Sequence, residues 1–297
     1  METRLAPKPF SDEKSDMNQP LIFRTLSDMR SQLASWRAQG QRIGFVPTMG
    51  ALHEGHISLT QIARQKAERV IVSIFVNPTQ FAPHEDFNSY PRTFEADLAQ
   101  LTAAGVDGVY YPSPEIMYPA GFATTVSLTG PAIANLEDRF RPTHFQGVAT
   151  IVAKLLIQSG ADVAVFGQKD FQQLAVISQM VADLNLPVDI IGAPIVREED
   201  GLAKSSRNAY LAAHERALAP ALYKSLLNCR TKIKAGGAPD AICAEEAKAL
   251  SALGFVVDYL EARDSTDLGP AQHANRRLLI AARIGTTRLI DNLAIDE

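Results

Sequence analysis

In the segment Gly44-Phe-Val-Pro-Thr-Met-Gly-Ala-Leu-His-Glu-Gly-His-Ile57, a strand, a turn and a helix follow one another. The apolar run from Ile43 ends at Pro47, which cannot donate to a sheet ladder and therefore marks the end of the strand. Two glycines then loosen the backbone, and apolar residues recur at helical spacing from Leu59. We predict that the helix begins near His56, so that its free N–H groups and its dipole face the turn and form a site for phosphate.

Two histidines, His53 and His56, stand three residues apart in this turn and can converge on one anion. The pair could also form half of a metal site, but no cysteine or third histidine lies close by in the sequence. The turn lacks the glycine pattern of dinucleotide-binding folds and the Gly-Lys-Ser/Thr of a P-loop. A phosphate-binding turn built on histidines resembles the His-x-Gly-His signature of nucleotidyltransferases and class I aminoacyl-tRNA synthetases.

The composition is that of a globular protein: the 297 residues are 46% apolar and 21% charged. A formal net charge of −4 argues against a general nucleic-acid-binding surface. Cys229 and Cys243 are the only cysteines, which argues against a disulfide scaffold or a zinc ribbon and suits a reducing cytoplasm. Residues 1–20 are polar, contain three prolines and are predicted to be a disordered tail. No apolar run reaches the roughly 20 residues of a membrane-spanning helix, so we expect no membrane partner.

Strand patterns alternate with helix patterns up to about residue 196, and this alternation predicts a Rossmann-like α/β domain with a parallel sheet. After Tyr210, two helical stretches that each open on a proline precede three strands, which predicts a smaller α+β unit. The predicted domains are therefore 21–196 and 197–297. Trp36 is expected in the core, and Glu85 and Asp86 are expected to be solvated charges. The expected strands are 43–46, 70–76, 106–111, 124–128, 162–166, 188–196, 255–262, 277–283 and 286–295, and the expected helices include 27–40 with Ser27 as N-cap, 91–104, 148–156, 220–235 and 239–253.

Four polar clusters follow predicted strands of the first domain. The carboxyl ends of parallel strands lie along one edge of a sheet, where ligands bind. Each cluster alone is also typical of an ordinary turn, although amide side chains orient hydroxyls and carboxylates well. Together they supply histidines, cations, hydroxyls and amides, which suits a multiply charged phosphate rather than sugar or peptide hydrolysis. The clusters are His53 to His56, Asn77 to Gln80, Gly167 to Gln173, and Lys204 to Asn208.

Several longer motifs also stand in one order along the chain: Pro47 to His56, Phe75 to Phe81, Tyr90 to Arg92, Arg141 to Gly147, Gly167 to Gln173, and Ser205 to Asn208. In these motifs, and from about residue 21 to its C-terminus, the chain resembles the pantothenate synthetase (pantoate–β-alanine ligase) family. The resemblance implies a cytoplasmic homodimer in coenzyme A biosynthesis. Pantoate and ATP, with Mg²⁺, would give pantoyl adenylate and pyrophosphate in the 21–196 domain, under a C-terminal lid. β-Alanine would then give pantothenate and AMP.

The resemblance also implies roles for the site residues. His56 would be the proton donor, Gln80 and Gln173 would hold pantoate, and Gln80 would also meet β-alanine. Asn77 is expected to be a further substrate-binding residue. The implied catalytic set is His53, His56, Lys169, Ser205, Ser206 and Arg207. The implied ATP-binding set is Met49, Gly50, Ala51, Leu52, His53, Glu54, Gly55, His56, Gly167, Gln168, Lys169, Asp170, Val196, Lys204, Ser205, Ser206 and Arg207.

Two positions depart from the family pattern. Lys204 stands where an apolar residue usually precedes Ser-Ser-Arg, and Gln168 replaces a common Glu. A cation at position 204 could reach the β- or γ-phosphate of ATP, whereas a lone exposed lysine usually contributes little. Two other functions stay open. A nucleotidyltransferase that releases a dinucleotide would not release AMP in response to β-alanine, and an RNA-binding or tRNA-charging module is disfavoured by the net charge of −4.

Overall fold

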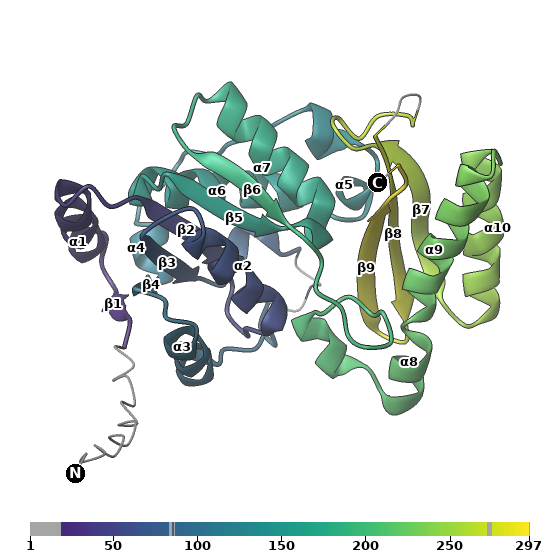
Figure 1. Ribbon diagram of the computed structural model, residues 1–297, viewed down its shortest axis with the longest axis horizontal. Helices are drawn as coiled ribbons and strands as arrows, with labels where there is room; N and C mark the ends of the chain where they lie inside the picture. Colours follow the sequence, from purple (N-terminus) through teal and green to yellow (C-terminus); the bar gives the residue numbers. More distant parts are fainter. Residues whose placement is uncertain (1–18, 83–84, 86, 272–274, 297) are drawn as a thin grey trace, which may run out of the picture.

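A computed structural model describes residues 19–82, 85, 87–271 and 275–296. Most of the predicted tail at 1–20, and Asp86, lie outside the described residues. Within them the chain forms a six-stranded parallel sheet followed by a three-stranded antiparallel sheet (Figure 1). The predicted fold class, a Rossmann-like α/β sheet followed by a smaller α+β part, is confirmed.

The parallel sheet has the strand order β1-β4-β3-β2-β5-β6. The chain runs outward from β2 through β3 to β4 and then returns to the other side of β2 to add β5 and β6. The direction of winding therefore changes between β2 and β5, which is where a crevice opens at the carboxyl ends of the strands. The strands are β1 (Leu21–Phe23), β2 (Ile43–Thr48), β3 (Arg69–Ile74), β4 (Gly108–Tyr110), β5 (Val163–Gly167) and β6 (Asp189–Ala193).

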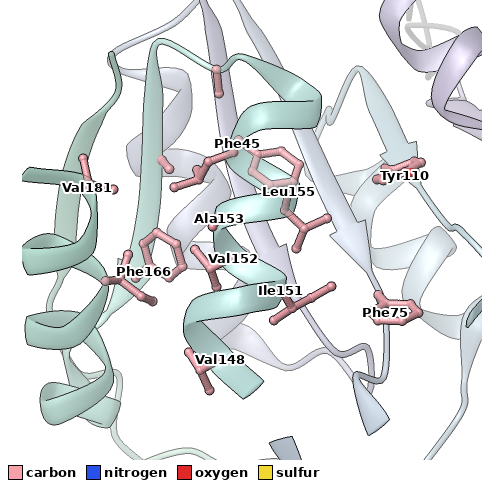
Figure 2. Packing of buried hydrophobic residues seen from close by; sticks show 14 of the residues in the cluster. Phe45, Phe75, Tyr110, Val148, Ile151, Val152, Ala153, Leu155, Phe166 and Val181 are labelled. Atoms are coloured by element: carbon pink, nitrogen blue, oxygen red, sulfur yellow. The ribbon is translucent and has the colours of Figure 1, made fainter. Parts of the chain in front are cut away.

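Helices cover both faces of this sheet. Successive residues of a strand point to opposite faces, and the apolar residues on each face pack against helices. Phe45 packs in a cluster with α1, α6 and α7, whereas its neighbour Val46 packs in a cluster with α2 and α3. Figure 2 shows side chains of α6 gathered with Phe45 of β2 and Phe166 of β5. Trp36 is buried in the same cluster, as predicted. The helices are α1 (Leu26–Ala38), α2 (Glu54–Arg64), α3 (Phe94–Ala103), α4 (Pro114–Met117), α5 (Glu137–Phe140), α6 (His144–Ser159) and α7 (Phe171–Asp183).

The antiparallel sheet is also covered on both faces. Leu278 and Ile280 pack with α9 and α10, whereas the alternate residue Leu279 packs with Leu136, Phe140 and other residues of the first part of the chain. The sheet therefore lies between its own helices and the α5 segment, as Figure 1 shows. The elements are α8 (Ala213–Leu218), α9 (Ala221–Lys234), α10 (Pro239–Ala252), β7 (Val256–Asp264), β8 (Arg276–Ile284) and β9 (Thr287–Ala294).

Several predicted boundaries were wrong. Helix α1 is capped by Thr25, whose hydroxyl accepts from the Asp28 N–H at 3.2 Å, and not by Ser27. Strand β2 continues through Pro47 to Thr48. A proline, which has no N–H, is tolerated inside the strand because β5 pairs with β2 only at Gly44 and Phe45. No N–H donor toward β5 is therefore needed at position 47.

The strand expected at 124–128 is also wrong. These residues are described and form no strand. The Val126 N–H instead donates to Thr150 Oγ1 of α6 at 2.9 Å, and Val126 packs against the first core cluster. Among the residues that the structure describes, every helix is too short or too polar to cross a membrane.

Candidate active site

A cavity of about 230 Å³ opens at the carboxyl ends of β2, β3 and β5. It lies where the winding of the sheet changes direction, as the sequence predicts for a ligand site. Residues from all four predicted polar clusters meet there. The predicted site residues that line it are Met49, His53, Gly55, His56, Gln80, Gly167, Lys169, Asp170, Gln173, Val196, Lys204, Ser205, Ser206 and Arg207.

The two histidines occupy the N-terminus of α2, which begins at Glu54, two residues before the predicted start. His53 is the N-cap, and its Nδ1 accepts from the Gly55 N–H at 3.1 Å. The His53 N–H in turn donates to His56 Nδ1 at 3.3 Å. Because each Nδ1 is an acceptor, each neutral ring carries its proton on Nε2. A Cβ at Gly55 would lie 2.8 Å from Cε1 of His53, so glycine leaves room for this ring.

Both imidazoles are neutral at pH 7. Burial, reinforced by Lys169 and Lys204, lowers the pKa of His53 to about 4. Burial and the neighbouring His53 lower the pKa of His56 to about 3, and the two ring centroids are 4.1 Å apart. The rings therefore act as Nε2–H hydrogen-bond donors in the protein alone, and a bound polyanion would raise both pKa values.

The turn between β2 and α2 is held from behind by Asp97 of α3, which the sequence analysis missed. Its buried carboxylate accepts from the Ala51 N–H at 3.0 Å and from the Leu52 N–H at 2.8 Å. Gly50 adopts a φ of +83°, and a Cβ there would lie 3.0 Å from Asp97 Oδ2. The described residues that line the cavity do not include Gly50, Ala51, Leu52 or Glu54. The part that Gly50, Ala51 and Leu52 take is to shape the turn.

Gln80 and Asn77 take different places after β3. The Gln80 side chain lines the cavity, with its Nε2 at 3.2 Å from Met49 Sδ and its Oε1 at 3.0 Å from Asn77 Nδ2. Asn77 is only 1% exposed and is not among the described lining residues. Its position is therefore behind Gln80, which does not favour the predicted direct contact with substrate.

Three of the residues that line the cavity are the cations Lys169, Lys204 and Arg207. The Lys169 ammonium lies 3.9 Å from the Asp170 carboxylate. Burial opposes the ionisation of Asp170, but the cations Lys169 and Arg207 outweigh it and hold its pKa below the ordinary value. Asn292 of β9 donates to the carbonyl oxygens of Gln168 and Lys169 at 2.8 and 2.9 Å, so the C-terminal sheet holds this turn in place. The Gln168 side chain itself donates to the Gly192 carbonyl at 3.3 Å, toward β6, and does not line the cavity among the described residues.

Lys204 lies in the cavity wall and is not a lone surface charge. Its ammonium is 2.5 Å from Glu54 Oε2 and 3.3 Å from Glu198 Oε2. The hydrogen bond to Glu54 raises the pKa of Lys204 above its ordinary value. The pair with Glu54 connects the loop before Ser205 to the N-terminus of α2.

Arg141 and His144, also in the lining, were not assigned a role from the sequence, although both stand in the Arg141 to Gly147 motif. Arg141 donates to both oxygens of Glu85 at 2.6 and 3.0 Å. The prediction that Glu85 is solvated was wrong, because its side chain is 17% exposed and paired. His144 Nδ1 donates to the Gln80 carbonyl at 3.0 Å, so its Nε2 is free to accept from Arg141 at 3.1 Å.

A larger cavity of about 800 Å³ adjoins the first one. It lies between the α5 segment and strands β8 and β9, and its wall includes Arg283 and Arg288. The two cavities share Arg141, Lys169, Asp170, Ser205 and Arg207. These shared groups therefore stand at the junction of a small pocket and a wider cleft under the C-terminal sheet.

Comparisons with known proteins agree with this geometry. A family model described as pantoate-beta-alanine ligase matches residues 21–294. The chain is 53% identical to a pantothenate synthetase of Rhodopseudomonas palustris (strain HaA2), and 55% identical to one of Nitrobacter winogradskyi; each match covers 93% of this chain and 99% of the relative.

Solved structures are similar over the same range. The pantothenate synthetase of Thermus thermophilus matches with a TM-score of 0.88 at 45% identity, covering 93% of this chain and 100% of that one. A pantoate-beta-alanine ligase of Francisella tularensis, complexed with beta-gamma ATP and beta-alanine, matches with a TM-score of 0.79 at 35% identity, covering 94% of this chain and 98% of that one.

Proposed function

The chain belongs to the pantoate–β-alanine ligase family, and we propose that the cavity at the ends of β2, β3 and β5 is where it catalyses that reaction. It is an ATP-dependent ligase that condenses pantoate with β-alanine to pantothenate. One observation supports the site above all: two neutral histidines and the cations Lys169, Lys204 and Arg207 line one cavity at the switch point of the sheet.

The first half-reaction is adenylation. A carboxylate oxygen of pantoate attacks the α-phosphorus of ATP, the bond to the bridging oxygen of the β-phosphate breaks, and pyrophosphate leaves. Lys169, Arg207 and the hydroxyls of Ser205 and Ser206 stabilise the charge that develops on the α-phosphate, because preorganised donors act most strongly where charge develops. His56 donates from Nε2 to a phosphate oxygen and becomes a stronger base as the polyanion raises its pKa.

The second half-reaction transfers the acyl group. The neutral amine of β-alanine attacks the acyl carbon of pantoyl adenylate, the C–N bond forms, the nitrogen loses a proton to solvent, and AMP leaves with the bonding electrons of the C–O bond. Gln80 and Gln173 line the cavity, together with apolar residues such as Phe75 and Phe166. Their amides suit the hydroxyl and carboxylate groups of pantoate, and by the family resemblance Gln80 would also meet β-alanine.

Mg²⁺ would accompany ATP. This ion is usually bound by one or two carboxylates together with substrate phosphates, and Asp170 is the one acidic side chain among the described residues that line the cavity. Asp170 therefore fits as a ligand. Across the described residues, no group of three or more His, Cys, Asp or Glu side chains could hold a metal without such help.

The wider assignment is also a proposal. Residues 21–196 would form the ATP- and pantoate-binding domain and residues 197–297 the lid, because the parallel sheet ends with β6 and the second sheet lies over the cleft. The family resemblance supports a homodimer, which sedimentation equilibrium tests. A cytoplasmic location is supported by the two buried, free cysteines, since reducing compartments keep thiols unpaired.

Isotope exchange tests the mechanism. With pantoate present and β-alanine left out, labelled pyrophosphate should enter ATP, and carboxylate oxygen label from pantoate should appear in AMP once β-alanine is added. Label in inorganic phosphate, with ADP as the product, would rule out the adenylate. No AMP release on addition of β-alanine, with a dinucleotide formed from a phosphate acceptor, would favour the dinucleotide-forming alternative.

A further inference from the structure

The turn that carries Gln80 is held by one buried amide. Asn77 Oδ1 accepts from the Tyr118 hydroxyl at 2.6 Å and from the Thr79 hydroxyl at 3.0 Å. Asn77 Nδ2 donates to the Gly147 carbonyl at 3.3 Å and to Gln80 Oε1 at 3.0 Å. The Asn77 side chain thus joins Tyr118, the residue after α4, and Gly147 of α6 to the 3₁₀ turn Pro78–Gln80.

These partners determine which way the Asn77 amide points. A backbone carbonyl such as that of Gly147 only accepts hydrogen bonds, so the NH₂ group of Asn77 must face it. The carbonyl end of Asn77 then faces the two hydroxyls, which can donate. Burial raises the pKa of Tyr118, so its hydroxyl stays protonated and available as a donor at neutral pH.

The orientation passes from Asn77 to Gln80. Since Asn77 offers an N–H, Gln80 must turn its own carbonyl oxygen toward Asn77. The NH₂ group of Gln80 is left on the cavity side, beside Met49 Sδ. A donor in that place suits the carboxylate or hydroxyl oxygens of an acid such as pantoate, whereas a carbonyl oxygen there would repel a carboxylate.

Gly147 contributes by lacking a side chain. A Cβ at this position of α6 would lie 2.4 Å from the Thr79 carbonyl oxygen and 2.8 Å from Gln80 Cα. Both atoms belong to the backbone and cannot rotate away. Any larger residue at position 147 must therefore push the turn off α6, even though glycine is unfavourable inside a helix.

We propose that Tyr118 and Gly147 are positioning residues, which act through Asn77 to present the NH₂ end of the Gln80 amide to the acid substrate. The proposal rests on the proposed role of Gln80 in holding pantoate. It assigns no contact with substrate to Tyr118 or Gly147. Neither of them is among the described residues that line the cavity.

The test uses Tyr118→Phe, which removes one hydroxyl and keeps the ring. The variant removes the shorter of the two hydroxyl donors to Asn77 Oδ1 and leaves Thr79, so the hold on the Asn77 amide, and through it on the Gln80 amide, becomes weaker. We expect the KM for pantoate to rise about fivefold, the effect of one hydrogen bond, while the KM for ATP stays within twofold. Tyr111→Phe, in a ring that stacks on Phe94, is the matched control and should change neither value.

Gly147→Ala is the stronger perturbation. It should lower kcat/KM for pantoate at least tenfold, and its crystal structure should show residues 78–80 displaced from α6. Gln146→Ala, at the neighbouring exposed position of the same helix, is the control. Residues 78–80 left in place in the Gly147→Ala structure would overturn the proposal, as would equal losses for pantoate and ATP in Tyr118→Phe.

A double-variant comparison separates this proposal from the role of Gln80. Gln80→Ala should itself raise the KM for pantoate, and adding Tyr118→Phe to it should change nothing further. If Gln80→Ala leaves pantoate binding intact, the proposed role of Gln80 is wrong. If Gln80→Ala is damaging but Tyr118→Phe has the same effect with and without it, Tyr118 does not act through Gln80.

Discussion

Replacing Arg288 by methionine would leave a carboxylate buried without its main partner. Glu137 of α5 is 7% exposed. Arg288 of β9 donates to its two oxygens at 2.7 and 2.8 Å, and the Tyr259 hydroxyl donates at 2.8 Å. Arg141 is more distant, at 4.0 Å. The Glu137–Arg288 pair is therefore the main polar link between the C-terminal sheet and the α5 segment, which leads into the proposed active site.

The expected loss of stability follows from this burial. Removing one partner of a buried ion pair costs about 3–5 kcal/mol, because the other charge is left uncompensated, whereas replacing both partners by neutral groups costs far less. Arg288 also donates from Nε to Asp258 at 2.7 Å. Without Arg288, the Asp258 carboxylate still has Arg283 as a partner at 4.0 Å. We therefore expect Arg288→Met to lower the free energy of unfolding by about 3–5 kcal/mol and Glu137→Gln/Arg288→Met by about 2 kcal/mol less than that.

The pH dependence gives a second check. Burial alone would raise the pKa of Glu137, but the hydrogen bonds and charge of Arg288 outweigh it and hold this pKa below the ordinary value. Without Arg288, burial prevails and the pKa of Glu137 rises. The cost of Arg288→Met is then full at pH 8, where Glu137 is ionised, and shrinks as the pH falls and the neutral acid forms.

Urea unfolding at 25 °C, at pH 8 and pH 5, measures these differences. Arg42→Met is the control, since Arg42 pairs with Asp189 at 3.7 Å with both side chains largely exposed, and should cost less than about 1 kcal/mol. The reasoning is refuted if Arg288→Met costs no more than Arg42→Met, or if the double variant is as unstable as the single one.

Three further outcomes are expected. His56→Ala should fold and should slow pantoate-dependent pyrophosphate exchange by about two orders of magnitude, the effect of losing one preorganised donor; exchange near the parent rate would contradict its role. Lys204→Met should raise the KM for ATP and leave the KM for pantoate unchanged, and the difference in the KM for ATP between variant and parent should shrink as salt rises. Equal KM values for ATP at low salt would mean that Lys204 serves only its two glutamate partners. Burial and Arg141 lower the pKa of His144 to about 4, so the stability that neutral His144 contributes is full above about pH 6.5 and is lost as the pH falls toward 4. His144→Gln should therefore flatten the fall in the free energy of unfolding between pH 7 and pH 5. An unchanged slope would exclude His144 as the source of that fall.

Residue pattern alone accounts for the local elements and for the chemistry at their ends. Apolar periodicity, glycine and proline predict the strands, the helices and the His53 to His56 turn, because these signals act between near neighbours in the chain. The meeting of the polar clusters in one cavity was also predictable, since parallel strands place their carboxyl ends on one edge. The exact starts of α1 and α2 were not, because Thr25 and His53 compete with nearby residues as caps through hydrogen bonds of similar strength.

Tertiary structure decided which polar residues face the cavity and which support it. Asn77 and Gln80 look alike in the sequence, yet packing against Gly147 buries one and exposes the other to the cavity. Asp97 binds the Leu52 N–H from 45 residues away, and Arg288 pairs with Glu137 across 151 residues. Such partners depend on how distant segments pack and on which groups that packing removes from water, and neither is encoded in any local spacing of residues.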